Sequence, residues 1–120
     1  MDEMKLGIVE AKFADIIWQN EPIASGELVK KCESELCWKK STTYTVLKKL
    51  CERGIFQNEK GCVTSLISEQ EFYSLQSERF VEENFGGSLP TFLAAFASRK
   101  KLSKEDADAL RKMIAEHGEG

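Results

Sequence analysis

Hydrophobic residues recur at intervals of three and four over the first twenty positions of the chain. The residues in this pattern are Leu6, Val9, Phe13, Ile16 and Ile17. Such spacing places them on one face of a helix with 3.6 residues per turn. Pro22 follows soon after and cannot continue a helix. The pattern therefore predicts one amphipathic helix that ends near Asn20.

The same spacing predicts two more helices before Gly54. Ser25 is of a residue type that caps helices, so it can begin the second one. The apolar positions of this second helix are Leu28, Val29, Cys32 and Leu36. A third helix is expected from near Ser41 to Arg53, because Gly54 readily adopts the left-handed conformation that closes a helix. Two short helices joined by a few residues are typical of a helix-turn-helix arrangement.

The pattern changes from helical to extended after the third helix. Residues 55–59 and 62–67 are two short strand candidates, and they flank Lys60-Gly61, a pair with turn chemistry. Three helices followed by a hairpin are the element order of a winged-helix domain. We therefore expect a protein that is mainly α with a small β-hairpin, and a winged helix-turn-helix DNA-binding domain over residues 1–68.

The rest of the chain returns to helical spacing. Ser68 is a suitable cap for a fourth helix, which Gly86-Gly87 would interrupt. Ser88 suits the start of a fifth, strongly apolar helix, and Ser103 suits the start of a last one. Three helices therefore follow the hairpin.

Helices over residues 69–120 would leave large apolar side chains without a core, because about 50 residues bury little surface on their own. A second copy of the chain would cover them, so we expect a helical dimerisation domain. The contact residues expected there are Phe72, Phe80, Phe92, Leu93, Phe96, Leu110, Met113 and Ile114. The alternative is that these helices fold back on the N-terminal domain.

Composition and charge narrow the class of partner. The chain has 120 residues, 42% hydrophobic and 31% charged, as in an ordinary globular protein. Its net charge of −3 argues against general binding to polyanions. Residues 24–61 nevertheless carry eight basic and five acidic side chains, whereas both flanking segments are net acidic. This internal segment is the candidate nucleic-acid face.

No pattern in the sequence indicates an enzyme, a metal site or a cofactor. Phosphate loops and nucleophile elbows are absent, and His117, the single histidine, lacks a cysteine or serine partner near it. Cys32, Cys37, Cys51 and Cys62 form no CxxC pair, so we expect reduced thiols. A thiol or zinc sensor would need Cys37 and Cys62 close together. The absence of a long apolar run and of a signal-peptide pattern predicts a cytoplasmic protein without a membrane partner.

The third helix begins with an unusual group of hydroxyl side chains. Its helical wheel places on the core side Thr43, Val46, Leu47, Leu50 and Cys51. The opposite side presents short hydroxyls and lysines, with Thr42, Thr45 and Lys49 on one stripe. Short hydroxyl side chains let a helix approach base edges, and lysines contact phosphates. The residues expected to contact DNA are Lys39, Lys40, Ser41, Thr42, Tyr44, Thr45, Lys48, Lys49 and, from the hairpin, Lys60.

Two alternatives apply to this surface. The Ser and Thr residues could simply cap the helix while the lysines solvate it. The domain could also be a protein-interaction module, such as an accessory or antirepressor subunit, which the acidic Glu52 and Glu59 near the proposed DNA face favour. The third helix of a winged-helix domain is the one that enters the major groove, which favours DNA binding.

Four segments carry a resemblance to a known family. They are ADIIW in the first helix, PIASGELVKK in the second, WKKSTTYTVLKKLCERGIF through the third, and GGSLPTFLAAFASRKKLSKEDADALRKMI near the C-terminus. The chain resembles the penicillinase-repressor family (BlaI/MecI type) over nearly its whole length. The resemblance implies a homodimer that binds a palindromic operator in double-stranded DNA and represses genes for antibiotic resistance or copper handling. By position it assigns Thr42 and Thr45 to base reading, and Ser41 and Lys49 to the DNA backbone.

The chain departs from this family in four features. Lys40 stands where the family often has proline, and Cys62 stands where its wing commonly carries arginine. Ala95-Phe96 replaces the Asn-Phe pair at which antibiotic-responsive members are cleaved, and the C-terminal cysteine cluster of copper-responsive members is absent. We therefore expect neither that cleavage nor release by copper, and the sequence indicates no other inducing signal.

Overall fold

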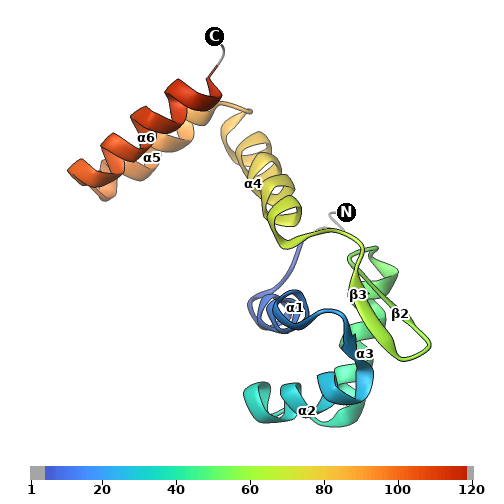
Figure 1. Ribbon diagram of the computed structural model, residues 1–120. Coiled ribbons are helices and arrows are strands. Elements are labelled where there is room, and N and C mark those ends of the chain that lie inside the picture. Colours follow the sequence, from blue (N-terminus) through green and yellow to red (C-terminus); the bar gives the residue numbers. More distant parts are fainter. Residues whose placement is uncertain (1–4, 119–120) are drawn as a thin grey trace. The chain divides into compact units, whose positions relative to one another are not determined.

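The computed structural model describes residues 5–118 (Figure 1). Its elements in chain order are α1 (Ile8–Asn20), β1 (Ile23–Ala24), α2 (Ser25–Leu36), α3 (Lys40–Glu52), β2 (Phe56–Glu59), β3 (Cys62–Ser65), α4 (Glu69–Phe85), α5 (Leu89–Arg99) and α6 (Lys104–His117). They form two compact units, and the division falls inside α4, between Ser77 and Glu78. The expected outer domain limits, residues 1 and 120, lie outside the described residues.

The first unit is a winged helix, as the element order predicts. Helices α1, α2 and α3 precede a hairpin of β2 and β3, and this hairpin lies beside α3 (Figure 1). The short strand β1, which the sequence did not predict, pairs with β3 and gives an antiparallel sheet in the order β1-β3-β2. Ala24 pairs with Cys62, and Phe56 pairs with Ser65. The protein is therefore mainly α with a small sheet.

The hairpin turn has the predicted chemistry. Lys60 and Gly61 have φ values of +52° and +82°, which is the pair of positive values that a tight two-residue hairpin turn requires. The Ser25 N–H donates to the Gly61 carbonyl oxygen at 2.8 Å, which ties this turn to the start of α2. The prediction that Ser25 caps α2 is wrong, because Ala24 holds the cap position and no side chain bonds there.

Aromatic side chains form the centre of the first unit. Phe13, Phe56 and Phe72 are completely buried, and each such side chain stabilises the fold by about 1.5–3 kcal/mol relative to exposure. Trp18 packs against both Phe56 and Phe72 at ring distances of 5.4 Å, and its indole N–H donates to the Ile67 carbonyl oxygen. This packing places the first turn of α4 in the first unit, although we expected the domain boundary between residues 68 and 69.

The apolar face of α1 is shorter than its sequence pattern. Phe13, Ile16 and Ile17 are buried as expected, but half of the Val9 surface is exposed. Val9 lies in the first turn of the helix, which extends past the side chains that form the core. Spacing alone therefore predicted the face of the helix but not where along the helix its burial begins.

The helices of the second unit are capped as the sequence predicts. The Ser88 hydroxyl accepts from the Thr91 N–H at the start of α5, and Ser103 does the same for Asp106 at the start of α6. The unit has little core of its own, because no described residue from 78 to 118 is buried. Its aromatic rings still gather, and Phe85 and Phe92 have ring centroids 5.4 Å apart.

Candidate nucleic-acid interface

Helix α3 presents one exposed polar stripe. Thr43, Leu47 and Leu50 are buried and fix the side of the helix that faces the core. The exposed residues on the opposite side, spaced by four, three and four, are Ser41, Thr45, Lys48 and Glu52. Residues with these spacings lie one above another on a helix. The centre of the outward face is therefore a stripe of two hydroxyls, one cation and one carboxylate.

The hydroxyl groups at the start of α3 do not cap it. Lys39 occupies the cap position, and no side chain donates or accepts there. Ser41, Thr42 and Thr45 are all exposed, and the structure places no described side chain within hydrogen-bonding distance of their hydroxyls. The alternative in which these residues serve as helix caps is therefore wrong. These exposed hydroxyls make no hydrogen bond among the described residues and can therefore bond to another molecule.

Lys49 lies at the side of α3 that faces α1. Its Nζ is 3.3 Å from Oε2 of Glu10, and Arg53 Nη1 is 3.4 Å from Oε1 of the same carboxylate. The Gly7 N–H also donates to Glu10 Oε1 at 3.0 Å. This backbone hydrogen bond, assisted by the two cations and opposed by partial burial, lowers the pKa of Glu10. The cationic side of the candidate interface therefore includes a carboxylate that remains charged at neutral pH.

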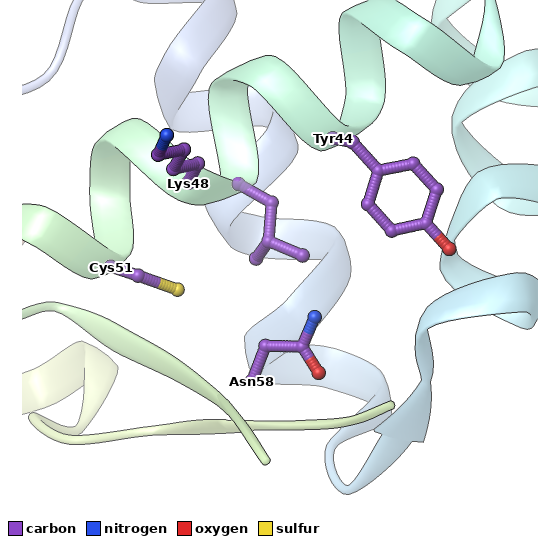
Figure 2. Close-up of a pocket in the computed structure, with 5 residues that line it drawn as sticks. Tyr44, Lys48, Cys51 and Asn58 are labelled. Carbon is purple, nitrogen blue, oxygen red and sulfur yellow. The ribbon is translucent and has the colours of Figure 1, made fainter. Parts of the chain in front are cut away.

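Tyr44 faces the neighbouring helix rather than the exposed stripe. Its hydroxyl donates to Ser25 Oγ at 3.1 Å, so the Ser25 side chain that we expected to cap α2 links α2 to α3 instead. Tyr44 also lines a shallow cavity of about 360 Å³ with Leu47, Lys48, Cys51 and Asn58. Figure 2 shows the α3 side chains on one side of this cavity and Asn58 of β2 on the other.

The remaining predicted DNA contacts are exposed lysines of the same unit. Lys39 and Lys40 lie at the start of α3, and Lys60 lies in the hairpin turn. The structure thus places all nine predicted residues on α3, on its cap or on the wing. It separates them by environment, because Tyr44 bonds to Ser25 and Lys49 pairs with Glu10, whereas Ser41, Thr45 and Lys48 share the outward stripe.

The cysteines are free thiols in different environments. Cys32 is buried, and this burial is the main cause of its raised pKa, which the neighbouring Thr43 hydroxyl opposes. Burial and the Glu52 carboxylate raise the pKa of Cys51. Cys37 and Cys62 are exposed. Among residues 5–118, no group of three or more potential ligands is arranged to hold a metal ion.

The predicted dimer contacts divide between the two units. Phe72 is completely buried in the first unit, so it is not free to contact a partner. Phe80, Phe96, Met113 and Ile114 have exposed fractions of 50%, 48%, 54% and 65%, respectively. Phe92, Leu93 and Leu110 are half-buried. Large apolar side chains thus remain accessible on all three C-terminal helices.

Three residues at this interface were not predicted from the sequence. Glu10 and Arg53 meet across 43 positions of sequence, and no local pattern indicates such a pairing. Asn58 could have been found, because it lies two residues after Phe56 on β2 and alternate strand residues share a face. Since Phe56 is buried, Asn58 lies on the same face of β2, close to the hairpin turn, where its side chain is exposed.

The fold and the exposed face of α3 define a winged-helix protein with an outward-facing third helix. Residues 6–116 match the family described as penicillinase repressor. The penicillinase repressor of Bacillus licheniformis is 26% identical over 112 residues, which are 90% of this chain and 88% of that protein. The chain belongs to the penicillinase repressor family, a family of transcriptional repressors. Within the described residues, no helix combines the length and apolar character needed to cross a membrane.

Proposed function

We propose that this protein is a sequence-specific transcriptional repressor that binds a palindromic operator as a homodimer. In this proposal, α3 of each protomer enters the major groove, and Thr45 and Thr42 face the base edges. Ser41 and the lysines of α3 and the wing contact the phosphate backbone. A two-fold dimer would present two such helices to successive turns of the operator.

The observation that carries this proposal is that the hydroxyl side chains at the start of α3 are exposed and do not cap the helix. Ser and Thr side chains in the first turns of a helix commonly bond to the helix itself, but here they are exposed and the cap position is Lys39. Hydroxyl oxygens can donate to or accept from base edges, and the threonine methyl can contact a thymine methyl. Membership of a repressor family supports the same function.

The apolar surface of the second unit supports the homodimer. No described residue from 78 to 118 is buried, although Phe96, Met113 and Ile114 are large and apolar. Covering such side chains stabilises an assembly by about 25 cal/mol for each Å² removed from water. In a two-fold symmetric dimer, the apolar surface of each chain would be covered by the same surface of the other chain.

A winged-helix protein-interaction module is the second candidate. The pairing of Lys49 with Glu10 favours it, because this ion pair neutralises a cation that DNA binding would use. Glu52 on the exposed stripe of α3 and the net charge of −3 also favour the protein-interaction module, because negative charge repels DNA phosphates. A module of this kind would bind a protein partner through α3 and would show no preference among DNA sequences.

Selection of bound fragments from the source genome separates the two candidates. The repressor should enrich a small set of fragments, and their affinity should fall steeply with salt because lysines release counterions from phosphates. An unrelated fragment of equal length, measured at the same salt concentrations, is the control. Equal enrichment of all fragments, or no binding at low salt, would contradict the proposal and favour the protein-interaction module.

A further inference from the structure

The Glu10 carboxylate joins the start of α1 to the C-terminal end of α3. It contacts Lys49 Nζ at 3.3 Å and Arg53 Nη1 at 3.4 Å. Glu10 is held in place, because its side chain is only 21% exposed and it also accepts the Gly7 N–H. Lys49 is the more accessible partner, since 55% of its side chain is exposed. The pair therefore consists of a fixed anion and a cation that can change partners.

A DNA phosphate is the natural competitor for Lys49. Carboxylate and phosphate oxygens accept the same charged N–H groups, and a lysine on a four-carbon stem can rotate from one to the other. Arg53 is more firmly held, because its Nη1 also donates to the Lys5 carbonyl oxygen at 3.1 Å. Lys49 is thus the cation whose pairing DNA binding would change.

We propose that Glu10 is a positioning residue that competes with DNA phosphate for Lys49 and so weakens binding to all DNA. This inference rests on the proposed function, since it requires that Lys49 contacts phosphate. Phosphate contacts carry no sequence information, so the effect applies equally to an operator and to unrelated DNA. Glu10 thereby lowers the affinity of the repressor for operator and non-operator sites alike.

The competition has a distinct salt signature. A free lysine that binds phosphate releases about 0.9 counterion from the DNA. When Lys49 leaves Glu10, the freed carboxylate attracts a cation, and the net release of ions is smaller. Removal of the Glu10 charge should therefore make the salt dependence of DNA binding steeper as well as the binding tighter.

The substitution Glu10→Gln tests this inference. Glutamine keeps the length of the side chain and the acceptor for the Gly7 N–H, and it removes only the charge. We expect about threefold to tenfold tighter binding to an operator fragment and to an unrelated duplex, with a log–log salt slope steeper by up to about 0.9 for each bound protomer. Glu33→Gln, which removes an equal charge from an exposed position of α2, is the control and should change both quantities much less.

A double-mutant cycle with Lys49→Gln distinguishes competition from general charge effects. In the Lys49→Gln background, Glu10→Gln should no longer tighten binding beyond the change caused by Glu33→Gln. An equal gain with and without Lys49, or no gain in either background, would overturn the inference. Should Glu10→Gln lower the melting temperature below the assay range, Glu10→Asp provides a second test. Its shorter side chain draws the carboxylate away from Lys49, so DNA binding should tighten in the same direction but by less.

Retention on heparin separates this inference from the proposed function. Heparin offers anionic groups without base edges, so later elution of Glu10→Gln than of Glu33→Gln would support competition for Lys49. If the same variant also bound an unrelated duplex more tightly while no DNA site were protected, the sequence-specific repressor would be overturned and the competition between Glu10 and phosphate would stand. Unchanged elution together with unchanged DNA affinity would overturn the role of Glu10 alone.

Discussion

Thr43 and Thr45 lie two residues apart on α3 and have opposite environments. Thr43 is completely buried, whereas Thr45 is exposed on the outward stripe. The helical wheel predicted this difference from the spacing of Val46, Leu47 and Leu50 alone. It could not predict that the hydroxyls of α3 leave the cap position to Lys39, because capping depends on the backbone path that enters the helix.

Thr45 is expected to contact a base through its methyl group, its hydroxyl or both. Thr45→Ser removes the methyl group and Thr45→Val removes the hydroxyl, so the pair separates the two kinds of base contact. If Thr45 reads a base, at least one substitution should reduce discrimination between operator and unrelated DNA by about 1–3 kcal/mol. Binding to unrelated DNA should stay the same. Competition binding assays measure both quantities, and unchanged discrimination in both variants would place base reading elsewhere on α3.

The buried hydroxyl of Thr43 is not expected to stabilise the fold. Its Oγ1 lies near the Cys32 thiol but has no partner in hydrogen-bonding geometry among the described residues. Thr43→Val keeps the shape and removes this unpaired polar atom. Its free energy of unfolding should therefore be unchanged or higher by about 1 kcal/mol. A loss of more than about 1 kcal/mol in urea unfolding would show that the hydroxyl has a stabilising partner.

The hairpin and the Glu10 contacts show what sequence predicts at the scale of elements. Lys60-Gly61 identified the turn because few residue pairs adopt two positive φ values. The strand β1 escaped prediction because two residues are too few for an alternating pattern. The contact between α1 and α3 also escaped, since its residues are far apart in sequence and their charges resemble those of any solvated helix.

The α1–α3 contact should be sensitive to acid. Since the pKa of Glu10 is lowered from about 4.5 in the folded state, folding favours the charged carboxylate. Its contribution is present above the unfolded pKa and is lost as the pH falls through the folded value. The free energy of unfolding of the wild type should therefore exceed that of Glu10→Gln by about 1 kcal/mol at pH 7. This difference should start to fall near pH 4.5 and vanish once the pH is below the lowered pKa of Glu10. Urea unfolding over a series of pH values from 7 down to 2 measures it, and a difference that stays constant over the whole series would contradict the assignment.

The two units of the molecule differ in how much apolar surface each buries by itself. The first unit buries an aromatic centre around Phe13, Phe56 and Phe72, whereas the described part of the second unit buries no residue. The sequence predicted an apolar surface that needs a partner. It placed Phe72 on that surface, because hydrophobicity alone does not tell a residue of the intrachain core from one that contacts another chain.

The homodimer should depend on that apolar surface. Ile114→Glu places a charge at a side chain that is 65% exposed. If the side chain is covered in a dimer, the dissociation constant should rise at least about 30-fold, as for a contact worth 2 kcal/mol or more. Ala115→Glu, at the next exposed position of α6, is the matched control. Sedimentation equilibrium measures both, and equal effects or a wild-type monomer would contradict the proposed dimer surface.

Footprinting of a fragment selected from the source genome tests whether a homodimer of this protein binds a palindromic operator. A homodimer with α3 in the major groove should protect two half-sites related by two-fold symmetry, with centres about one helical turn, 10–10.5 bp, or a multiple of it apart. The footprint should disappear when the half-sites are scrambled at unchanged length. Protection of a single site without symmetry, or no protection at low salt, would contradict an operator-binding dimeric repressor.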